Sequence, residues 1–313
     1  MYYFNYRAWF AYDAKDYLKL HREGFICATY NNEIGKKLLI DLPKLIDEND
    51  PVDAYAYALA LYKNGDLIDK NKAFYLFDKL CDIEYLPAYN AYAICLFEGI
   101  CVPKNLNGAI KLFKKASDLG CISAKYNLGY CYIFGYGVEK NISIGSSLIE
   151  TAADKGLSQA NHALGLYYYK GENGYPQDYY AAFNYLKEAS NRYSAKAAYL
   201  LAEMYQNGLG CEKSIDNCIK EHTHAALLDY VPSQKFLGDA FYYGNIVEKN
   251  IDRAYSNYLA AANNGDSYAM YSVGYMIVTG KAFWIMDKSI GKDWLIKAAN
   301  LGNNDAKELL KKL

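Results

Sequence analysis

A pattern that recurs about every 36 residues organises this chain. In the stretch 124–156, AKYNLGYCYIFGYGVEKNISIGSSLIETAADKG, an apolar helical pattern leads through a glycine-containing turn into a second helical pattern. In that second pattern Gly145, Ile149 and Ala152 are spaced by four and three residues, so they share one helix face. Their first member recurs at steps of 36 or 37 residues, as Ala73, Ala109, Gly145, Ala182, Cys218, Ala254 and Gly291. Seven copies at a fixed period predict an all-α solenoid of helix pairs.

Helix start and stop residues recur at the same period. Four residues before each first member stands a residue that can cap a helix N-terminus: Asp69, Asn105, Asn141, Asp178, Ser214, Asn250 and Asp287. The preceding helix of each pair is predicted to end at a glycine, which suits a left-handed C-terminal position: Gly65, Gly99, Gly135, Gly171, Gly208, Gly244 and Gly280. Glycine in the middle of a helix, as at Gly129 and Gly165, costs about 1 kcal/mol against alanine. Its recurrence predicts that the paired helix approaches too closely for a side chain.

The repeats define three segments. Residues 1–52 lack the full pattern and are predicted to form an N-terminal helical cap with a degenerate half repeat, in which Pro43 could kink an amphipathic helix. The seven full repeats occupy residues 53–304. Residues 305–313 are predicted to form a single C-terminal capping helix, because a terminal repeat must cover its apolar face.

The composition argues against several classes of partner. Charged residues make up 22% of the chain and the formal net charge is −1, so there is no basic footprint for nucleic acid. No apolar run reaches the roughly 18 residues of a membrane-spanning helix. The N-terminal sequence MYYFNYRAWFAYDAKDYLKL has no basic region followed by an apolar run, and the eight cysteines form no CxxC pair. We therefore expect a cytoplasmic protein with reduced thiols, a monomer by default.

Residues for catalysis or metal binding do not cluster in the sequence. His222 and His224 point about 200° apart on a helix, so the two rings cannot hold one metal ion. The glycines of Gly135-Tyr136-Gly137 recur as a turn between helices with no strand before them, which favours a conformational role over phosphate binding. Motifs of nucleophile elbows, zinc proteases and phosphate loops are absent. We predict no catalytic residue, no cofactor, no metal and no enzymatic activity.

These repeats resemble the Sel-one-like repeat, a relative of the tetratricopeptide repeat. The pattern is matched by Ala124, Leu128-Gly129, Tyr132, Gly135-x-Gly137-Val138, Asn141 and Ala152-Ala153-x-x-Gly156. The resemblance implies a right-handed superhelix whose first helices line the concave face, and a scaffold or adaptor role. The copy around 205–230 is the weakest, with His222 at the aromatic position, so we expect irregularity in its second helix. Some secreted members carry a cysteine pair in every repeat, but here Tyr89 stands where the partner of Cys81 would fall.

One stripe on the first helices is richer in aromatic residues than a solvated face should be. Counting the opening small residue as position 1, positions 3, 7 and 10 share a stripe that faces away from the stack. We predict that this stripe is a concave, Tyr-rich groove that binds a protein or peptide partner through aromatic anchors. Its candidate residues are Ile94, Phe97, Tyr126, Tyr130, Ile133, His162, Leu166, Tyr169, Tyr199, Tyr242, Tyr271 and Tyr275.

Two functions fit such a groove. The first is an adaptor that assembles signalling or regulatory partners. The alternative resembles the use of these repeats in bacterial toxin–immunity systems, where the repeat protein binds and neutralises a cognate toxin. A structural alternative also stays open, in which curvature packs the stripe residues against one another and the tyrosines are filler.

Overall fold

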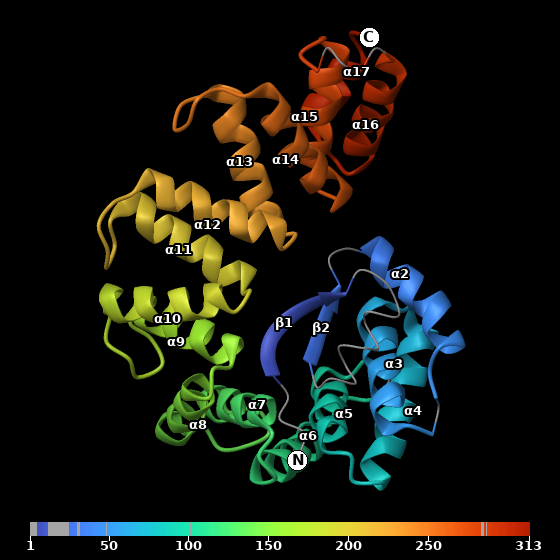
Figure 1. The fold of residues 1–313 in the computed structure, drawn as a ribbon, viewed down its shortest axis with the longest axis vertical. Coiled ribbons are helices and arrows are strands. Elements are labelled where there is room, and N and C mark those ends of the chain that lie inside the picture. Colours follow the sequence, from blue (N-terminus) through green and yellow to red (C-terminus); the bar gives the residue numbers. More distant parts are fainter. Residues whose placement is uncertain are drawn as a thin grey trace. The chain divides into compact units, whose positions relative to one another are not determined.

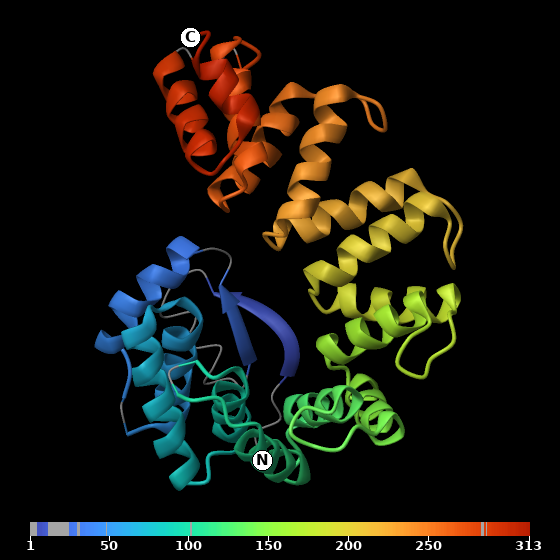
Figure 2. The ribbon, with the colours of Figure 1, turned by 180° about the vertical axis from the view of Figure 1, so that it is seen from behind.

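The computed structural model describes residues 5–11, 25–29, 32–47, 49–100, 102–282, 285 and 287–313. By its internal contacts the chain divides into two compact units, Met1–Tyr193 and Ser194–Leu313. Within each unit the helices follow one another as antiparallel pairs, as the opposite views in Figure 1 and Figure 2 show. Each repeat helix packs most extensively on the other member of its pair, and within each unit the second helix of a pair also packs on the first helix of the next pair. The described repeat region is an all-α solenoid of seven helical hairpins.

The first unit contains four hairpins and the N-terminal segment. The N-terminal elements are β1 (Asn5–Ala11), β2 (Phe25–Thr29), α2 (Asn32–Asp41) and the 3₁₀ helix η1 (Leu42–Lys44). The hairpins are α3 (Pro51–Asn64) with α4 (Leu67–Asp82), α5 (Leu86–Glu98) with α6 (Leu106–Asp118), α7 (Ile122–Phe134) with α8 (Ile142–Asp154), and α9 (Ser158–Lys170) with α10 (Tyr179–Asn191).

The second unit contains three hairpins and a final helix. They are α11 (Ala195–Asn207) with α12 (Ile215–Leu227), α13 (Val231–Tyr243) with α14 (Ile251–Asn263), α15 (Ser267–Val278) with α16 (Lys288–Asn300), and α17 (Asn304–Leu310). In α17, Ala306 is fully buried, and Leu309 and Leu310 pack against the core of the last hairpin. The single C-terminal helix is therefore present as predicted.

The N-terminal segment differs from the helical cap that we expected. β1 and β2 pair in parallel, with Trp9 opposite Cys27 and Ala11 opposite Thr29, and an irregularity separates Asn5 from Trp9. Aromatic and β-branched residues favour extended backbone, which explains strands in a segment that lacks the repeat pattern. The amphipathic helix that we expected around Pro43 ends at Asp41, and the proline lies in η1.

α3 is covered on all sides. Its residues from Asp53 to Leu61 are all buried, and they pack with Leu38 and Leu42 from α2 and η1. No other first helix has an unbroken buried run of this kind. α2 and η1 therefore close the apolar face of the first repeat, which is the task of a terminal cap.

The capping residues confirm six of the seven predicted starts of the second helices. Side chains of Asn105, Asn141, Asp178, Ser214, Asn250 and Asp287 accept hydrogen bonds from amides in the first turn. In the first copy the cap is Asp66, and Asp69 is its partner in a capping box, because the preceding turn is shorter. Gly65 is also an exception, with φ −86° instead of the left-handed value that Gly99 shows at +72°.

The mid-helix glycines lie where two helices touch. A Cβ on Gly129 would come 2.8 Å from the carbonyl oxygen of Gly145, and one on Gly238 would come 2.5 Å from the ring of Tyr258. The expected close approach is therefore present. The predicted irregularity of the fifth second helix is not, because α12 has the same 13-residue length as α10 and α14.

A side chain joins α4 to α5 at Tyr89, which stands at the position of the missing partner of Cys81. The Tyr89 hydroxyl donates to the Cys81 carbonyl over 3.1 Å, eight residues back. Two further copies repeat this contact with an amide, since Asn161 donates to the Ala153 carbonyl and Gln234 donates to the Ala226 carbonyl. In these three copies a side-chain hydrogen bond thus links the end of one hairpin to the start of the next.

Candidate interaction surface

Position 3 of the predicted stripe packs against the following repeat. Tyr199 on α11 lies 5.4 Å, between ring centroids, from Tyr230, the residue that caps α13. Lys235 on α13 makes a 3.1 Å ion pair with Asp266, the residue that caps α15. In both contacts the partner is 31 residues further along the chain. Position 3 therefore contributes to stacking between repeats.

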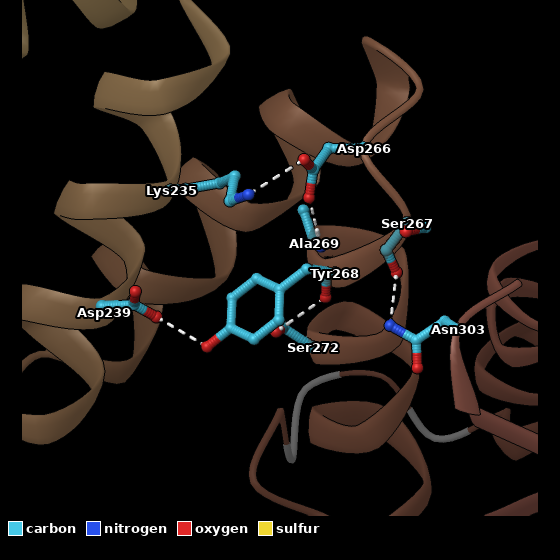
Figure 3. Close-up of polar contacts among 8 residues, drawn as sticks. All are labelled: Lys235, Asp239, Asp266, Ser267, Tyr268, Ala269, Ser272 and Asn303. Carbon is cyan, nitrogen blue, oxygen red and sulfur yellow. Dashed lines mark hydrogen bonds and ion pairs between the residues drawn. The ribbon is translucent and has the colours of Figure 1, made fainter. Parts of the chain in front are cut away.

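Position 7 of α13 extends this contact into a polar network (Figure 3). The carboxylate of Asp239 accepts hydrogen bonds from the hydroxyls of Tyr258, at 2.6 Å, and Tyr268, at 2.9 Å. The ammonium of Lys235 lies 5.4 Å from the Tyr268 ring centroid. Burial raises the pKa of both tyrosines above its usual value, so both hydroxyls keep their protons and act as donors. The network ties α13 to α14 and α15 with every group paired.

Other contacts in Figure 3 hold the start of α15. The Ala269 amide donates to Asp266, the Ser272 hydroxyl donates to the Tyr268 carbonyl, and the Asn303 amide donates to the Ser267 carbonyl. Because Asn303 is the residue that caps α17, this last bond connects the final helix to the hairpin that it covers.

In the first unit, four aromatic residues meet where α5 and α7 end. Tyr136, in the turn after α7, lies 5.7 Å from Phe97 and 6.0 Å from Tyr130, between ring centroids. Phe134 lies 4.5 Å from Tyr130 and stacks on Tyr136 at 5.9 Å. Phe134 and Tyr136 are each 39% exposed. We call these four residues the aromatic cluster. Two of them, Phe97 and Tyr130, belong to the predicted stripe.

In the second unit, a lysine replaces an aromatic residue at the equivalent place. Lys281, in the turn after α15, donates a hydrogen bond to the Tyr242 hydroxyl. Its ammonium lies 4.7 Å from the Tyr242 ring centroid and 4.9 Å from that of Tyr275. The hydrogen bond to Tyr242 raises the pKa of Lys281 above its ordinary value. Tyr271 adds a second ring beside Tyr275, at 5.9 Å between centroids. We call Tyr242, Tyr275 and Lys281 the lysine site.

The aromatic cluster and the lysine site follow one rule. In each, the residue that follows the glycine at the end of a first helix packs against position 10 of the first helix in the repeat before, 39 residues earlier. It also packs against position 7 of the first helix in its own repeat. The sequence prediction missed Phe134, Tyr136 and Lys281 because it considered one helical stripe and left out the turn. The 36-residue register, extended to turn residues, could have found Tyr136 and Lys281.

The remaining stripe residues divide between core and surface. Ile133 is fully buried beside Gly145, so it belongs to the core and is not part of the candidate interaction surface. Tyr126 packs against the core of the third and fourth hairpins, and burial raises its pKa to about 12. The others are partly exposed: Ile94, His162, Leu166 and Tyr169.

Histidine and acidic groups do not assemble a metal site in the described part of the chain, where no three of the His, Cys, Asp and Glu side chains come close enough to hold an ion. His222 is buried, with Nδ1 at 3.1 Å from the Ser233 hydroxyl and its ring stacked 3.8 Å from Phe236. Burial lowers its pKa to about 4. It fills the aromatic position of its repeat as a neutral core residue.

A protein-family model matches most of the chain. The Sel1 repeat model matches residues 53–83, 86–121, 122–157, 158–194, 195–220, 231–266 and 267–303. The chain belongs to the Sel1 repeat family. The fifth match stops at residue 220, which agrees with the weak copy seen in the sequence. Sel1 repeat proteins are generally non-catalytic scaffolds for protein interactions.

Solved structures share the Sel1 repeat fold. A protective antigen of uropathogenic Escherichia coli has a TM-score of 0.62 at 23% identity, covering 87% of this chain, which spans 58% of the antigen's chain. A Sel1 repeat protein from Oxalobacter formigenes also has a TM-score of 0.62, at 25% identity, covering 79% of this chain and 99% of that chain. An immunity protein from Pseudomonas aeruginosa is more distant, with a TM-score of 0.43 at 19% identity and coverage of 70% and 83%. A comparison with curated protein sequences found no match.

No described helix combines the length and the apolar character that crossing a bilayer requires. On the described residues of this Sel1 repeat chain, two features lie at the surface outside the packed core: the aromatic cluster and the lysine site.

Proposed function

We propose that this Sel1 repeat protein is a non-enzymatic scaffold that binds a protein or peptide partner through the aromatic cluster of its first unit. One observation carries the proposal: Phe134 and Tyr136 stack on each other at the surface while each stays 39% exposed. Aromatic rings in such positions supply most of the binding energy in many protein interfaces. Phe97 packs against Tyr136, and Tyr130 packs against both exposed rings, so the surface is preorganised.

The test replaces only the exposed rings. The double variant Phe134→Ala/Tyr136→Ala should lose partner capture from the native host while its melting temperature stays close to that of the wild type. Tyr180→Ala is the matched control, because Tyr180 is 70% exposed on α10 and lies outside the cluster. Full capture by the double variant would contradict the proposal. Tyr126 is a poor choice for this test, because its partial burial would confuse lost binding with lost stability.

A toxin-neutralising role uses the same surface and stays an alternative. The likeness to the Pseudomonas aeruginosa immunity protein is too distant to support it. The captured chain decides between the two roles: a toxic enzyme whose activity falls when the two proteins bind would identify an immunity protein, and a regulatory or signalling protein would identify an adaptor.

We further propose that the protein acts in the cytoplasm as a monomer. For the cytoplasm, support comes from the six cysteines described, which are present as reduced thiols: Cys81, Cys95, Cys121, Cys131, Cys211 and Cys218. Burial raises the pKa of Cys131 and of Cys218 to about 11, so neither thiol ionises readily near neutral pH. Cell fractionation and sedimentation of the purified chain test the two statements separately.

A further inference from the structure

The lysine site of the second unit has an arrangement of donors that the stacking of repeats does not require. Tyr242 comes from the end of α13, Tyr275 from α15 and Lys281 from the turn after α15. Lys281 is exposed, and its ammonium lies within 5 Å of both ring centroids. Three side chains from three segments thus converge on one point of the surface.

The site has more hydrogen-bond donors than its own members use. An ammonium can only donate hydrogen bonds, so the Tyr242 hydroxyl accepts from Lys281 and its O–H group can donate to another acceptor. Tyr242 and Tyr275 both act as hydrogen-bond partners of the ammonium, which has three N–H groups, so one N–H remains. A positive charge and a polarised hydroxyl beside it form a site for an anion, in which charge-assisted hydrogen bonds are stronger than neutral ones.

The described surroundings do not supply that anion. The groups that act on the pKa of Lys281 are the tyrosines Tyr242 and Tyr275, with no carboxylate among the described residues. This differs from Lys235 in the same unit, which is paired with Asp266 at 3.1 Å. The described residues therefore leave an N–H group of Lys281 for an acceptor that they do not supply.

We propose that Tyr242, Tyr275 and Lys281 form a second binding site, which takes a carboxylate of an acidic peptide segment on a protein partner. The ring of Tyr275 lies beside the ammonium, with that of Tyr271 next to it, and these apolar rings suit the carbon chain of such a segment. A nucleic acid is a poorer fit, since its binding needs a row of cations and this site has one. The proposal does not depend on the aromatic cluster, which lies in the other unit.

Fluorescence anisotropy with the full-length chain tests the proposal. The probe is a labelled, capped octapeptide of alternating Glu and Ala, and the same peptide with Gln for Glu removes only the charge. Lys281→Met should weaken binding of the acidic peptide about tenfold or more, and Tyr242→Phe, which keeps the ring, should weaken it about threefold. Lys220→Met is the matched control, because Lys220 is an exposed lysine on α12 away from these tyrosines.

Each outcome decides the matter. Selective binding of the Glu peptide, lost in Lys281→Met and kept in Lys220→Met, supports the site. Equal binding of the Gln peptide, unchanged binding by Lys281→Met, or no saturation by about 1 mM peptide overturns it. Tighter binding of a single-stranded oligothymidine would also overturn it in favour of nucleic acid. The variant Phe134→Ala/Tyr136→Ala should bind the acidic peptide normally, which separates this test from that of the proposed function.

Discussion

At the scale of single residues, His222 departs most clearly from the repeat pattern. The equivalent residue in the other copies is a large apolar or aromatic one: Phe77, Phe113, Ile149, Leu186, Tyr258 and Leu295. Among the described residues, the buried Nε2 of His222 has no hydrogen-bond partner, and the ring is held by Phe236 and Tyr199. On the same helix, Glu221 and His224 interact with each other. Burial is the cause of the pKa shift of His222, and no described charge acts on the ring to compensate a proton there.

We predict that this histidine makes stability depend on pH. Its pKa falls from 6.5 to about 4 on folding because of burial, so folding is favoured while the ring is neutral. The contribution is complete above the unfolded pKa of 6.5 and is lost as the pH falls from there towards 4. Between pH 7 and pH 4 the loss should be about 2 to 3 kcal/mol in the free energy of unfolding.

The double variant His222→Phe/Ser233→Ala isolates this effect, because both changes restore residues typical of the repeat. The free energy of unfolding, measured with urea at several pH values, should fall less for the variant than for the wild type between pH 7 and pH 4. The difference should be about 2 to 3 kcal/mol. The wild type and the variant have the same carboxylates, so these contribute equally to the pH dependence of both. An identical dependence of the free energy of unfolding on pH would therefore show that His222 does not carry the effect.

At the scale of the hairpin, the closeness of two helices sets which residues fit. Gly129 on α7 and Gly145 on α8 face each other, and each carbonyl oxygen lies within 3 Å of where the other residue's Cβ would be. The fifth copy holds Ala202 at the first position and Cys218 at the second, both fully or almost fully buried. That hairpin therefore packs with side chains in place of the backbone contact.

We predict that Gly129→Ala destabilises the protein although alanine is the better helix former. The gain in helix propensity is about 1 kcal/mol. The new methyl group would meet a backbone oxygen at 2.8 Å, which cannot move aside without shifting α8, so the net cost should be about 2 kcal/mol or more. Thermal and urea unfolding measure it. The control Ser147→Ala, at an exposed site on α8, should stay within about 0.5 kcal/mol of the wild type.

The hairpins could be predicted from sequence because each is specified by neighbours in the chain. The small residues at Gly145 and Ala152 and the cap at Asn141 act within one repeat, so a periodic pattern reveals them. The parallel strands β1 and β2 could not be predicted in this way, because their pairing lies outside any repeat. Of the predicted stripe, Tyr130 and Tyr275 contribute rings to the aromatic cluster and the lysine site, and their role in binding stays a prediction. Ile133 instead faces the core, because position 10 lies close to the packed face of the helix.

At the scale of the whole molecule, the described hairpins within each unit contact mainly their neighbours in sequence. Helix contacts there run from pair to pair, so the ends of the repeat array need special protection. At the C-terminal end α17 gives that protection, with Ala306 fully buried and Leu309 and Leu310 against the core that contains Leu295.

We predict that deleting residues 304–313 loosens the last hairpin without unfolding the first unit. The exposed core of α15 and α16 should exchange its amide hydrogens faster, because local opening then needs less free energy. Hydrogen–deuterium exchange read by mass spectrometry should show this increase in 267–300 and unchanged protection in 86–170. A uniform increase along the whole chain would contradict nearest-neighbour stability.

The placement of Tyr136 and Lys281 has a consequence for how such proteins diversify. Both residues stand just after a helix, in a turn that the core does not constrain, yet each completes a contact with the preceding repeat. A single substitution in such a turn can therefore replace an exposed aromatic surface with a charged one while the helices and their core stay the same. Lineages could acquire new binding preferences at these points at little cost in folding, one repeat at a time.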